Sequence, residues 1–388
     1  MTVDLLDLTT FVESREYDAF RTLRDTAPVS HNPEPDGSGF WSVTRYAHVN
    51  EAARDHARLL SGRGTQIKDR RAEGHGHPSV HNSDPPLHGQ LRNVVLPALS
   101  RQAVLKRKER FRAIVDQLID DAPRDEPFDF VDAIAIKLPM MVIADVLGVP
   151  VEDSERLVAW ANRMSDVRAG DAAQGEARAA LFDYFRWLAE MRRENPADDV
   201  ATALVAAAID GQPLAEQALD AYFILLTVAG NETTRFLLTG GFAQLLRQPD
   251  ELAKLRADPR LVTPAIEEMC RFVSPVTHMR RTAATDIDLF GTAIPAGGKV
   301  VLWFASANRD ERQFATPDQL QIDRTPNAHV GFGVGAHFCV GAHLARLETR
   351  LFLDAFLARI QSMELLSEPT RLPSNWFTGW TDMSVRWS

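Results

Sequence analysis

Residues 331–342 read Gly331-Phe332-Gly333-Val334-Gly335-Ala336-His337-Phe338-Cys339-Val340-Gly341-Ala342, a glycine-rich loop that carries one cysteine. The residues after the cysteine, Val340 to Ile360, have apolar side chains at helical spacing, so we expect the sulfur at a helix N-terminus. The free N–H groups and the helix dipole there favour a thiolate. Gly333, Gly335 and Gly341 permit positive φ values and a flat backbone. A soft anionic ligand on a flat loop suits haem iron.

Two other interpretations of this cysteine stay open at this point. A free cysteine is most often a small buried core residue. Zinc is the second alternative, because His329, His337 and His343 lie near Cys339 and supply possible nitrogen and sulfur ligands. Their spacing matches none of the common zinc-finger patterns, and the second cysteine, Cys270, is remote in sequence.

Composition indicates a soluble globular enzyme. The 388 residues are 45% hydrophobic and 25% charged, with a net charge of -10 that argues against a nucleic-acid-binding surface. Two cysteines give no disulfide framework, so we expect a reducing, cytoplasmic setting. The most apolar window, 131–149, contains Lys137, Pro139 and Asp145, and we therefore expect no membrane anchor.

The pattern of the chain predicts a mainly α fold with a small β region. Helical spacing covers five long segments: Gln102–Asp121, Val151–Arg168, Gln174–Glu194, Glu216–Gln248 and Val340–Ile360. Strand-like pieces are few and short, the best being Phe40–Arg45 and the glycine- and proline-punctuated region Asp286–Phe304.

The loop also supports a resemblance to a known family. Phe332-x-x-Gly335-x-x-x-Cys339-x-Gly341 resembles the haem-ligand signature of the cytochrome P-450 superfamily, the thiolate-ligated haem monooxygenases. The resemblance implies the P-450 fold as one haem domain over residues 1–388, with heme b (iron protoporphyrin IX) ligated by the Cys339 thiolate and lying beside Phe332, Gly333 and Gly341. The sequence contains no flavin or nicotinamide fingerprint, so we expect no fused reductase and electrons from a separate ferredoxin and ferredoxin reductase.

A second motif lies in the segment Phe223–Leu237, an apolar helix with a polar middle. Threonine hydroxyls there can bond to an earlier carbonyl and bend or widen the helix. Ala229-Gly230-x-Glu232-Thr233-Thr234 resembles the oxygen-activation segment of the family, a long central helix over the haem. The resemblance implies that Ala229 and Gly230 border the haem, that Thr233 holds oxygen and a water, and that Glu232 relays protons from solvent. An ordinary kinked core helix is the alternative.

Two further sets of residues match the family. Glu268 and Arg271 are three apart, the spacing for side-chain contact on a helix. They match a Glu-x-x-Arg element that would form a buried network with Arg324 and brace the haem loop. The haem propionates need cations, and by resemblance these would be His88, Arg92, Arg281 and His337. Arg280, adjacent to Arg281, leaves an ambiguity of one residue.

Basic residues offer a dock for an acidic ferredoxin, although an ordinary solvated helix surface is the alternative. The candidates are Arg101, Lys106, Arg107, Lys108, Arg110, Arg346 and Arg350. A local patch of this kind on an acidic protein would bind its partner in a salt-dependent manner.

The expected reaction is insertion of one atom of O2 into a C–H bond, because a thiolate ligand favours O–O cleavage. A haem-thiolate peroxygenase or isomerase, or a non-catalytic haem sensor, remains the alternative. Leu226, Val276, Trp376 and Phe377 could line an apolar substrate pocket, or belong to the ordinary core. A charged loop with Lys68, Arg70, Arg71, His75 and His77 could meet a carboxylate, although a solvated loop is the simpler interpretation. The Ala-Gly-Asn-Glu-Thr-Thr form of the oxygen segment resembles that of terpenoid, steroid and branched-lipid hydroxylases.

Overall fold

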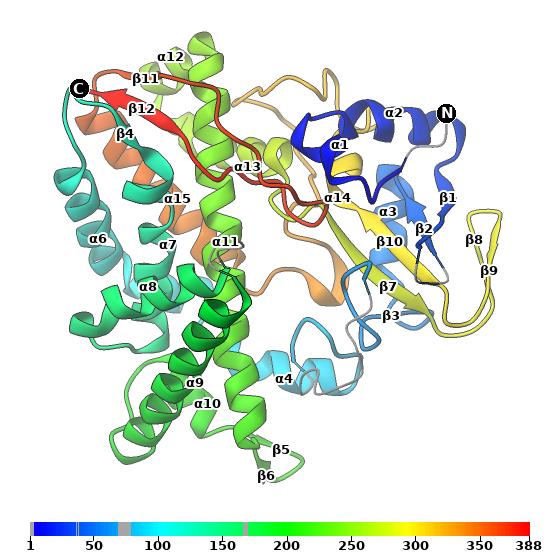
Figure 1. Cartoon of the computed structure of the whole chain (residues 1–388), viewed down its shortest axis with the longest axis horizontal. Helices are drawn as coiled ribbons and strands as arrows, with labels where there is room; N and C mark the ends of the chain where they lie inside the picture. Colours follow the sequence, from blue (N-terminus) through cyan, green and yellow to red (C-terminus); the bar gives the residue numbers. More distant parts are fainter. Residues whose placement is uncertain (1–3, 36, 38, 69–78, 166–169) are drawn as a thin grey trace.

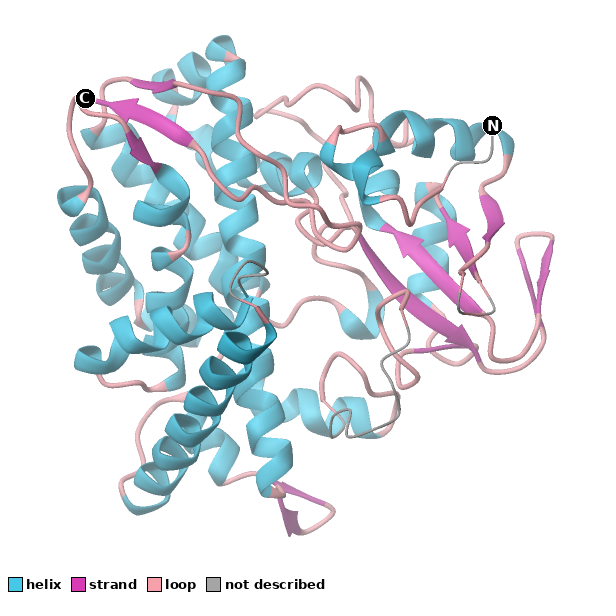
Figure 2. Cartoon of the chain, in the orientation of Figure 1, coloured by secondary structure: helices cyan, strands magenta, loops and turns pink. Residues whose placement is uncertain are grey.

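The structure is a computed structural model, and it describes residues 4–35, 37, 39–68, 79–165 and 170–388. Helices fill one side of the molecule and the main β-sheet lies on the other side, with one long helix, α11, between them (Figures 1 and 2). The two chain ends lie far apart, the N-terminal end on the sheet side and the C-terminal end over the helices.

The helices of the described chain have the following bounds. The α-helices are α1 (Leu8–Val12), α2 (Glu16–Thr26), α3 (Tyr46–Arg54), α4 (Leu87–Val95), α5 (Arg101–Lys106), α6 (Lys108–Asp121), α7 (Lys137–Leu147), α8 (Ser154–Ser165), α9 (Asp171–Glu194), α10 (Val200–Val205), α11 (Glu216–Arg247), α12 (Pro249–Ala257), α13 (Val262–Val273), α14 (Phe304–Ala307) and α15 (Ala342–Arg359). A π-helical turn, η1 (Val131–Ala135), and three 3-10 turns, η2 (Val151–Asp153), η3 (Pro259–Leu261) and η4 (Gly335–His337), complete them.

The helical core forms around α11 because this helix has apolar residues on every side. It packs against α7, α9, α13, α15 and η1. Phe130, Phe242 and Phe352 form a ring cluster where η1, α11 and α15 meet. The hydroxyl of Tyr222 donates a hydrogen bond to the Leu91 carbonyl (2.8 Å), which joins α11 to the segment that carries His88 and Arg92. The middle of α11 is therefore held in place by its neighbours on several sides.

The main sheet has the strand order β1 (Val29–Asn32), β2 (Phe40–Val43), β10 (Lys299–Trp303), β7 (His278–Ala283), β3 (Leu59–Leu60). β10 runs parallel to β2 and antiparallel to β7, and all five of its residues are buried. Smaller sheets pair β11 (Met363–Leu365) and β4 (Phe128–Asp129) with β12 (Ser384–Trp387), β5 (Ala208–Ile209) with β6 (Gln212–Pro213), and β8 (Ile287–Leu289) with β9 (Thr292–Ile294).

The mainly α architecture agrees with the expectation, but several boundaries differ. The expected helix Gln102–Asp121 is divided at Arg107, whose backbone (φ -92°, ψ 0°) leaves the helical region and separates α5 from α6. The expected helix from Val151 begins with the 3-10 turn η2, and its residues 166–168 lie outside the described residues. β7 was not expected as a strand, because its polar residues hide the pattern of a buried strand.

Within the described ranges, no helix is both long enough and apolar enough to cross a membrane.

Candidate active site

The cysteine loop lies between η4 and α15. Cys339 donates its backbone N–H to the Phe332 carbonyl (2.8 Å), which closes the loop across seven residues. α15 begins at Ala342 with Gly341 as its N-cap residue, so Cys339 precedes the helix by three residues. The loop therefore presents the sulfur just outside the N-terminus of α15.

The surroundings of the Cys339 sulfur are partly hydrophobic and partly cationic. Burial raises the pKa of the Cys339 thiol, whereas a hydrogen bond from the Gly341 N–H and the charges of Arg92 and Arg346 act to lower it. Cys339 nevertheless has a solvent-exposed surface. The N–H donor and the two cations are the features that stabilise a thiolate over a thiol.

The three loop glycines differ in their roles. Gly333 and Gly335 have φ values of 68° and 73°, in the left-handed region that favours glycine. A Cβ on Gly335 would lie 3.1 Å from the Ala53 carbonyl oxygen of α3, so a side chain would also be crowded there. Gly341 has φ -86°, so it does not adopt the positive φ that glycine permits. Its contribution is the N–H that points to the sulfur.

The polar middle of α11 contains the second set of expected residues. Ala229 is exposed although it lies in the centre of a buried helix, and Glu232 and Thr233 are half-buried. The Thr233 hydroxyl donates to the Ala229 carbonyl (2.8 Å). Residues 216–247 are nevertheless α-helical without interruption, so the expected bulge is absent from this described helix. Four-residue back-bonding by threonine is compatible with an intact helix.

Four cationic or imidazole side chains meet in one cluster, which we call the cation cluster: His88, Arg92, Arg281 and His337. The rings of His88 and His337 have centroids 4.1 Å apart, and His337 Nε2 is 3.1 Å from the Ser61 hydroxyl. Burial and then the charges of Arg281, His88 and Arg92 lower the pKa of His337 to about 3. Three segments that are far apart in the sequence, carrying His88 and Arg92, Arg281, and His337, therefore converge in the structure.

The structure separates Arg280 from Arg281. The Arg280 guanidinium donates to the carbonyls of Arg63 (2.8 Å) and Gln66 (3.3 Å), in the loop after β3. Arg281 bonds only to the neighbouring Arg280 carbonyl (2.9 Å) among the described residues, and its charge acts on His88 and His337. Burial lowers the pKa of Arg281 to about 10, with Asp84 opposing. Arg281 is thus the member of the pair that belongs to the cation cluster.

The cation cluster and the cysteine loop fit a haem. The negative charge of Asp84 acts to raise the pKa of both His88 and Arg281. Its two carboxylate oxygens already accept hydrogen bonds from the backbone N–H groups of Ser61 and Gly62. His88 is only 4% exposed, yet its Nε2 has no hydrogen-bond partner in the described part of the chain. A buried cationic group of this kind calls for further anions. Two haem propionates would supply such anions, and Cys339 would supply the soft ligand.

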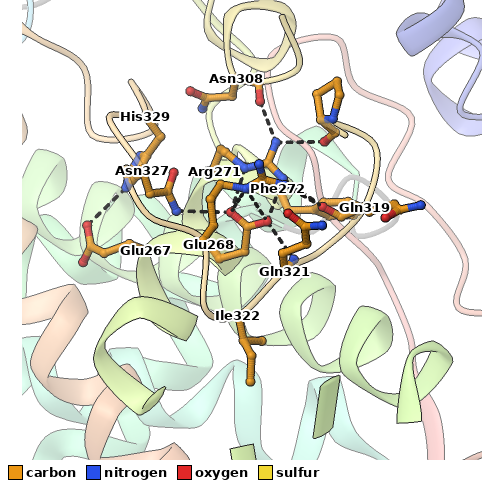
Figure 3. Close-up of polar contacts among 12 residues, drawn as sticks. Glu267, Glu268, Arg271, Phe272, Asn308, Gln319, Gln321, Ile322, Asn327 and His329 are labelled. Atoms are coloured by element: carbon orange, nitrogen blue, oxygen red, sulfur yellow. Dashed lines mark hydrogen bonds and ion pairs between the residues drawn. The ribbon is translucent and has the colours of Figure 1, made fainter. Parts of the chain in front are cut away.

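Glu268 forms the centre of a buried network beneath the loop (Figure 3). It accepts two hydrogen bonds from Arg271 (2.7 and 2.8 Å) and two from Arg324 (3.0 and 3.1 Å). Asn327 and the Gln321 N–H complete its shell. Arg271 continues the network to the carbonyls of 308, 317 and 319. The network joins α13 to the chain that leads into the cysteine loop.

A second ion pair near this network, between Glu267 and Arg346, was not predicted from the sequence. Glu267 accepts two hydrogen bonds from Arg346 (both 2.7 Å) and lies 3.1 Å from His329 Nε2. Burial acts to raise the pKa of Glu267, but the hydrogen bonds from Arg346 and His329 lower it to about 2. The Arg346 guanidinium lies 4.2 Å from the centre of the Phe332 ring. Figure 3 shows Glu267 directed to His329, away from the Glu268 network.

Glu348 is a second residue that sequence reasoning missed. It lies on α15, is 2% exposed, and accepts a hydrogen bond from the Thr234 hydroxyl of α11 (2.8 Å). Burial raises its pKa to about 8, and the Thr234 bond opposes this shift. The signal in the sequence was a glutamate on the apolar side of the helix after the cysteine, at i+9, where helical periodicity predicts burial.

The structure brings together only some of the residues expected to line the substrate pocket. Val276 and Phe377 form an isolated β-bridge, and the Trp376 and Phe377 rings have centroids 4.4 Å apart. Leu226 instead packs in the helical core around α11. In the charged loop, Arg70, Arg71, His75 and His77 lie outside the described residues.

Several of the expected docking cations are engaged within the chain. Arg107 donates to the carboxylate of Asp145 (2.7 Å), Arg350 to Thr263 (2.6 Å) and Arg346 to Glu267. Arg101, Lys106 and Lys108 are exposed, and Leu105 between them is 45% exposed. The alternative of a zinc site gains no support, because the described residues contain no group of three or more His, Cys, Asp or Glu side chains placed to hold a metal ion.

Comparison with known proteins agrees with this geometry. The Cytochrome P450 family model matches residues 37–375. The chain is 35% identical to linalool 8-monooxygenase of Pseudomonas putida, over 98% of both chains, and 37% identical to a methyl-branched lipid omega-hydroxylase of Mycobacterium bovis, over 95% of this chain and 90% of that protein. A Mycobacterium marinum cytochrome P450 in complex with pseudoionone superposes with a TM-score of 0.93 at 35% identity, covering 100% of this chain and 98% of that chain. The chain therefore belongs to the cytochrome P450 family, and it is a monooxygenase that uses haem with a cysteine thiolate ligand, O2 and a redox partner.

Proposed function

We propose that the chain hydroxylates a small, largely hydrophobic substrate of the terpenoid, steroid or branched-lipid class, and that Cys339 is its haem ligand. The observation that carries the ligand assignment is the placement of Cys339 just before α15, with the Gly341 N–H on its sulfur and the charges of Arg92 and Arg346 acting on it. Cys270, the other cysteine, is 2% exposed, and burial raises the pKa of its thiol far above the usual range. Cys339 is exposed and accepts a hydrogen bond from the Gly341 N–H, whereas Cys270 is enclosed by the core, so the assignment falls on Cys339.

The haem would be held by residues on both sides of the site. Cys339 would ligate the iron, and His88, Arg92, Arg281 and His337 would bind the propionates. Phe332, Gly333 and Gly341 would lie along the cysteine side, with Ala229 and Gly230 of α11 on the opposite side. When bound, the haem supplies the electron-rich thiolate-ligated iron at which O2 is activated. The network of Glu268, Arg271 and Arg324 would hold the cysteine loop in register with α13.

The residues of α11 would handle the protons of the reaction. Thr233, bonded to the Ala229 carbonyl, presents its hydroxyl oxygen at the exposed position of the helix. Glu232 is adjacent and half-buried, so it can exchange protons with water and pass them to the Thr233 hydroxyl. A positioned acid of this kind contributes typically 10²–10⁴-fold to rate.

The substrate class follows from the relatives and from the residues near the site. The two curated relatives are named for linalool and methyl-branched lipids, and a related structure holds pseudoionone. The paired segments at Val276 and Phe377, with Trp376 stacked beside them, would form an apolar wall. Leu226 packs in the helical core and is not part of this proposed wall. Apolar walls with few polar groups suit a substrate recognised by shape.

We propose a ferredoxin as the electron donor, supplied by a ferredoxin reductase. The exposed cations Arg101, Lys106 and Lys108 lie close in sequence to the exposed Leu105, on α5 and at the start of α6. α5 and α6 pack against α15, the helix that follows Cys339. Exposed cations beside an exposed apolar side chain suit an acidic partner that binds transiently. The two cysteines and this kind of donor fit the expected cytoplasmic setting.

A ligand screen tests the substrate proposal. Linalool, a methyl-branched fatty acid and a steroid should each be added to the ferric protein, with benzoate as a small, polar control. We expect the haem absorption band to shift with at least one apolar compound, and the same compound to yield a hydroxylated product when ferredoxin and its reductase are supplied. Band shifts with benzoate alone would contradict the proposed class.

A further inference from the structure

A second cavity, which we call the peripheral cavity, lies between α1, α2, the end of α11 and the C-terminal segment 368–380 (Figure 1). Its volume is about 410 Å³, and small-molecule pockets typically measure about 300–1,000 Å³. On α11 it reaches Gln244, which follows Thr233 by 11 residues, or about 16 Å along the helix axis. None of the described residues that line it belongs to the cation cluster or to the cysteine loop. The peripheral cavity is therefore separate from the haem site.

Two buried arginines give the peripheral cavity a cationic wall. The side chains of Arg309 and Arg371 are 7% and 10% exposed, and the Nε of each is buried without a hydrogen-bond partner in the described chain. Arg309 pairs with Asp318 (3.1 Å). Arg371 pairs with Glu16 (2.8 Å). Neither carboxylate is among the described lining residues. Burying a cation with incomplete hydrogen bonding is unfavourable, so an anion in the cavity is stabilised.

The charges of the lining favour an anion with one negative charge. The charged side chains that the structure places around the cavity are those of Arg247, Arg309, Arg371, Glu13 and Glu368. Arg247 pairs with Glu368, which leaves one more arginine than glutamate in this set. A monoanion balances that excess.

Aromatic rings supply the apolar part of the cavity. The Arg309 guanidinium lies 3.6 Å from the centre of the Phe272 ring and 4.6 Å from that of Tyr17. The Arg371 guanidinium lies 5.9 Å from the centre of the Trp380 ring. All three rings belong to lining residues, so cations and apolar surface alternate along one wall.

The fold holds this wall in place. Arg371 and Trp380 form an isolated antiparallel β-bridge. A Cβ on Gly240 would overlap the Trp380 ring, so this ring rests directly on the backbone of α11. Pockets for small molecules are usually preformed in this way.

The helix α1 extends the apolar surface beyond the cavity. Val12 lines the cavity and is 38% exposed, and Leu8 is 41% exposed. Side chains four residues apart lie on the same face of a helix, so Leu8 continues the surface that Val12 begins. Exposed apolar side chains beside a cationic cavity match the two parts of an amphiphile.

We propose that the peripheral cavity binds an amphiphilic monocarboxylate of the fatty-acid class, at a site separate from the haem. The carboxylate lies against the guanidinium groups of Arg309 and Arg371, because guanidinium groups form strong charge-assisted hydrogen bonds with carboxylates. The hydrocarbon chain lies along the aromatic rings and over Val12 and Leu8. The site does not depend on the substrate proposed above, since the haem site contributes none of the described lining residues.

Binding of decanoate to the haem-loaded protein tests this proposal. A bulky azole bound to the iron blocks the haem site, and equilibrium dialysis with labelled decanoate then measures binding elsewhere. We expect saturable binding of one decanoate per chain. Decanol has the same chain without the charge and should bind at least about tenfold more weakly. Absence of saturable binding, or equal affinity for decanol, would overturn the proposal.

Two matched variants locate the effect. Val12→Glu places a negative charge at the cavity, so decanoate should bind at least about tenfold more weakly. Val151→Glu is the control, because Val151 is 86% exposed and lies on η2, outside the cavity lining. Arg371→Gln should also weaken binding, but it leaves Glu16 buried without its partner. Val12→Glu therefore decides the question if Arg371→Gln does not fold. Equal affinities in Val12→Glu and Val151→Glu would contradict the assignment.

A decanoate that carries a photoreactive diazirine at the end of its chain identifies the site directly. We expect the label on the tryptic peptide that ends at Arg15 and contains Leu8 and Val12. Label found instead on the middle of α11, and lost when the azole is added, would show that decanoate binds only at the haem site. That result would refute the peripheral site and leave the proposed hydroxylase function intact.

Discussion

The hydroxyl of Thr234 on α11 donates a 2.8 Å hydrogen bond to Oε1 of Glu348 on α15. Thr234 follows the proposed oxygen-handling Thr233, and Glu348 lies nine residues after Cys339, so this buried bond links the elements on the two sides of the proposed haem site. The other carboxyl oxygen of Glu348 is buried and has no partner within the described residues. Such an environment favours the neutral acid.

Glu348 should make stability depend on pH. Its pKa in the folded chain is about 8, compared with an ordinary value of 4.5. The folded state therefore keeps a proton that the unfolded chain loses, and this contribution to stability is complete below pH 4.5 and is lost as pH rises to about 8. Relative to Glu348→Gln, the wild type should lose up to about 1.4 kcal/mol of unfolding free energy per pH unit across this window.

Urea unfolding of the wild type and Glu348→Gln at several pH values from 4.5 to 8.5 measures this difference. Thr234→Val, introduced into the wild type and into Glu348→Gln, is the matched control. The Thr234 hydroxyl can donate to a glutamate or a glutamine at position 348, so its loss should not depend on the titration of Glu348. A difference between Glu and Gln that stays constant with pH would show that Glu348 titrates normally.

Removing the charge of Glu268 should be far more damaging than removing an exposed glutamate. Glu268→Gln removes the negative charge that balances the buried guanidinium groups of Arg271 and Arg324. Breaking a buried ion pair in this way lowers the free energy of unfolding by about 3–5 kcal/mol. Glu364→Gln breaks the exposed pair with Arg386 and should cost roughly 0–1 kcal/mol. Urea midpoints of both variants give the comparison, and equal losses would contradict a bracing role for the network.

Arg346 and Lys108 should affect different properties. Arg346 is bonded to Glu267 and stacked on Phe332, so Arg346→Gln should speed haem loss and shift the reduction potential. Lys108 is exposed, so Lys108→Gln should weaken ferredoxin binding and reduce its salt dependence. Haem transfer to an acceptor protein and partner titrations at several salt concentrations measure the two effects. If ferredoxin binding to Arg346→Gln became less dependent on salt while its rate of haem loss stayed unchanged, Arg346 would belong to the docking surface instead.

Thr233→Ala should separate oxygen consumption from product formation. Loss of the hydroxyl removes the proposed proton donor, so peroxide per reducing equivalent should rise and product should fall, while the carbon monoxide spectrum stays unchanged. Thr239→Ala is the control, because that hydroxyl also bonds four residues back, to the Arg235 carbonyl (2.9 Å). If Thr233→Ala and Thr239→Ala form equal amounts of product per reducing equivalent, Thr233 has no part in the proton relay.

The local sequence pattern was sufficient to predict the long helices and the cysteine loop. The expected helix Glu216–Gln248 is found as Glu216–Arg247, and the expected Val340–Ile360 as Ala342–Arg359. Both are long segments rich in helix-forming apolar residues, α11 followed by Pro249 and α15 preceded by Gly341, and these are properties of the sequence alone. The division at Arg107 has no glycine or proline to announce it, so it followed only from the structure.

Long-range pairs were harder to foresee. The contact of Glu267 with Arg346 joins residues 79 apart, and that of Thr234 with Glu348 joins residues 114 apart. Nothing in a local window indicates which acid will meet which base, because the tertiary fold brings them together. The cation cluster was expected only because a family resemblance supplied the positions of its members.

The central claim is that Cys339 ligates the haem iron, and the carbon monoxide spectrum of reduced Cys339→Ala tests it most directly. Cys270→Ala is the matched control, since it removes the other thiol while leaving the loop intact. We predict that Cys270→Ala keeps the thiolate-type band and that Cys339→Ala loses it. A thiolate-type band that persists unchanged in Cys339→Ala would contradict the account.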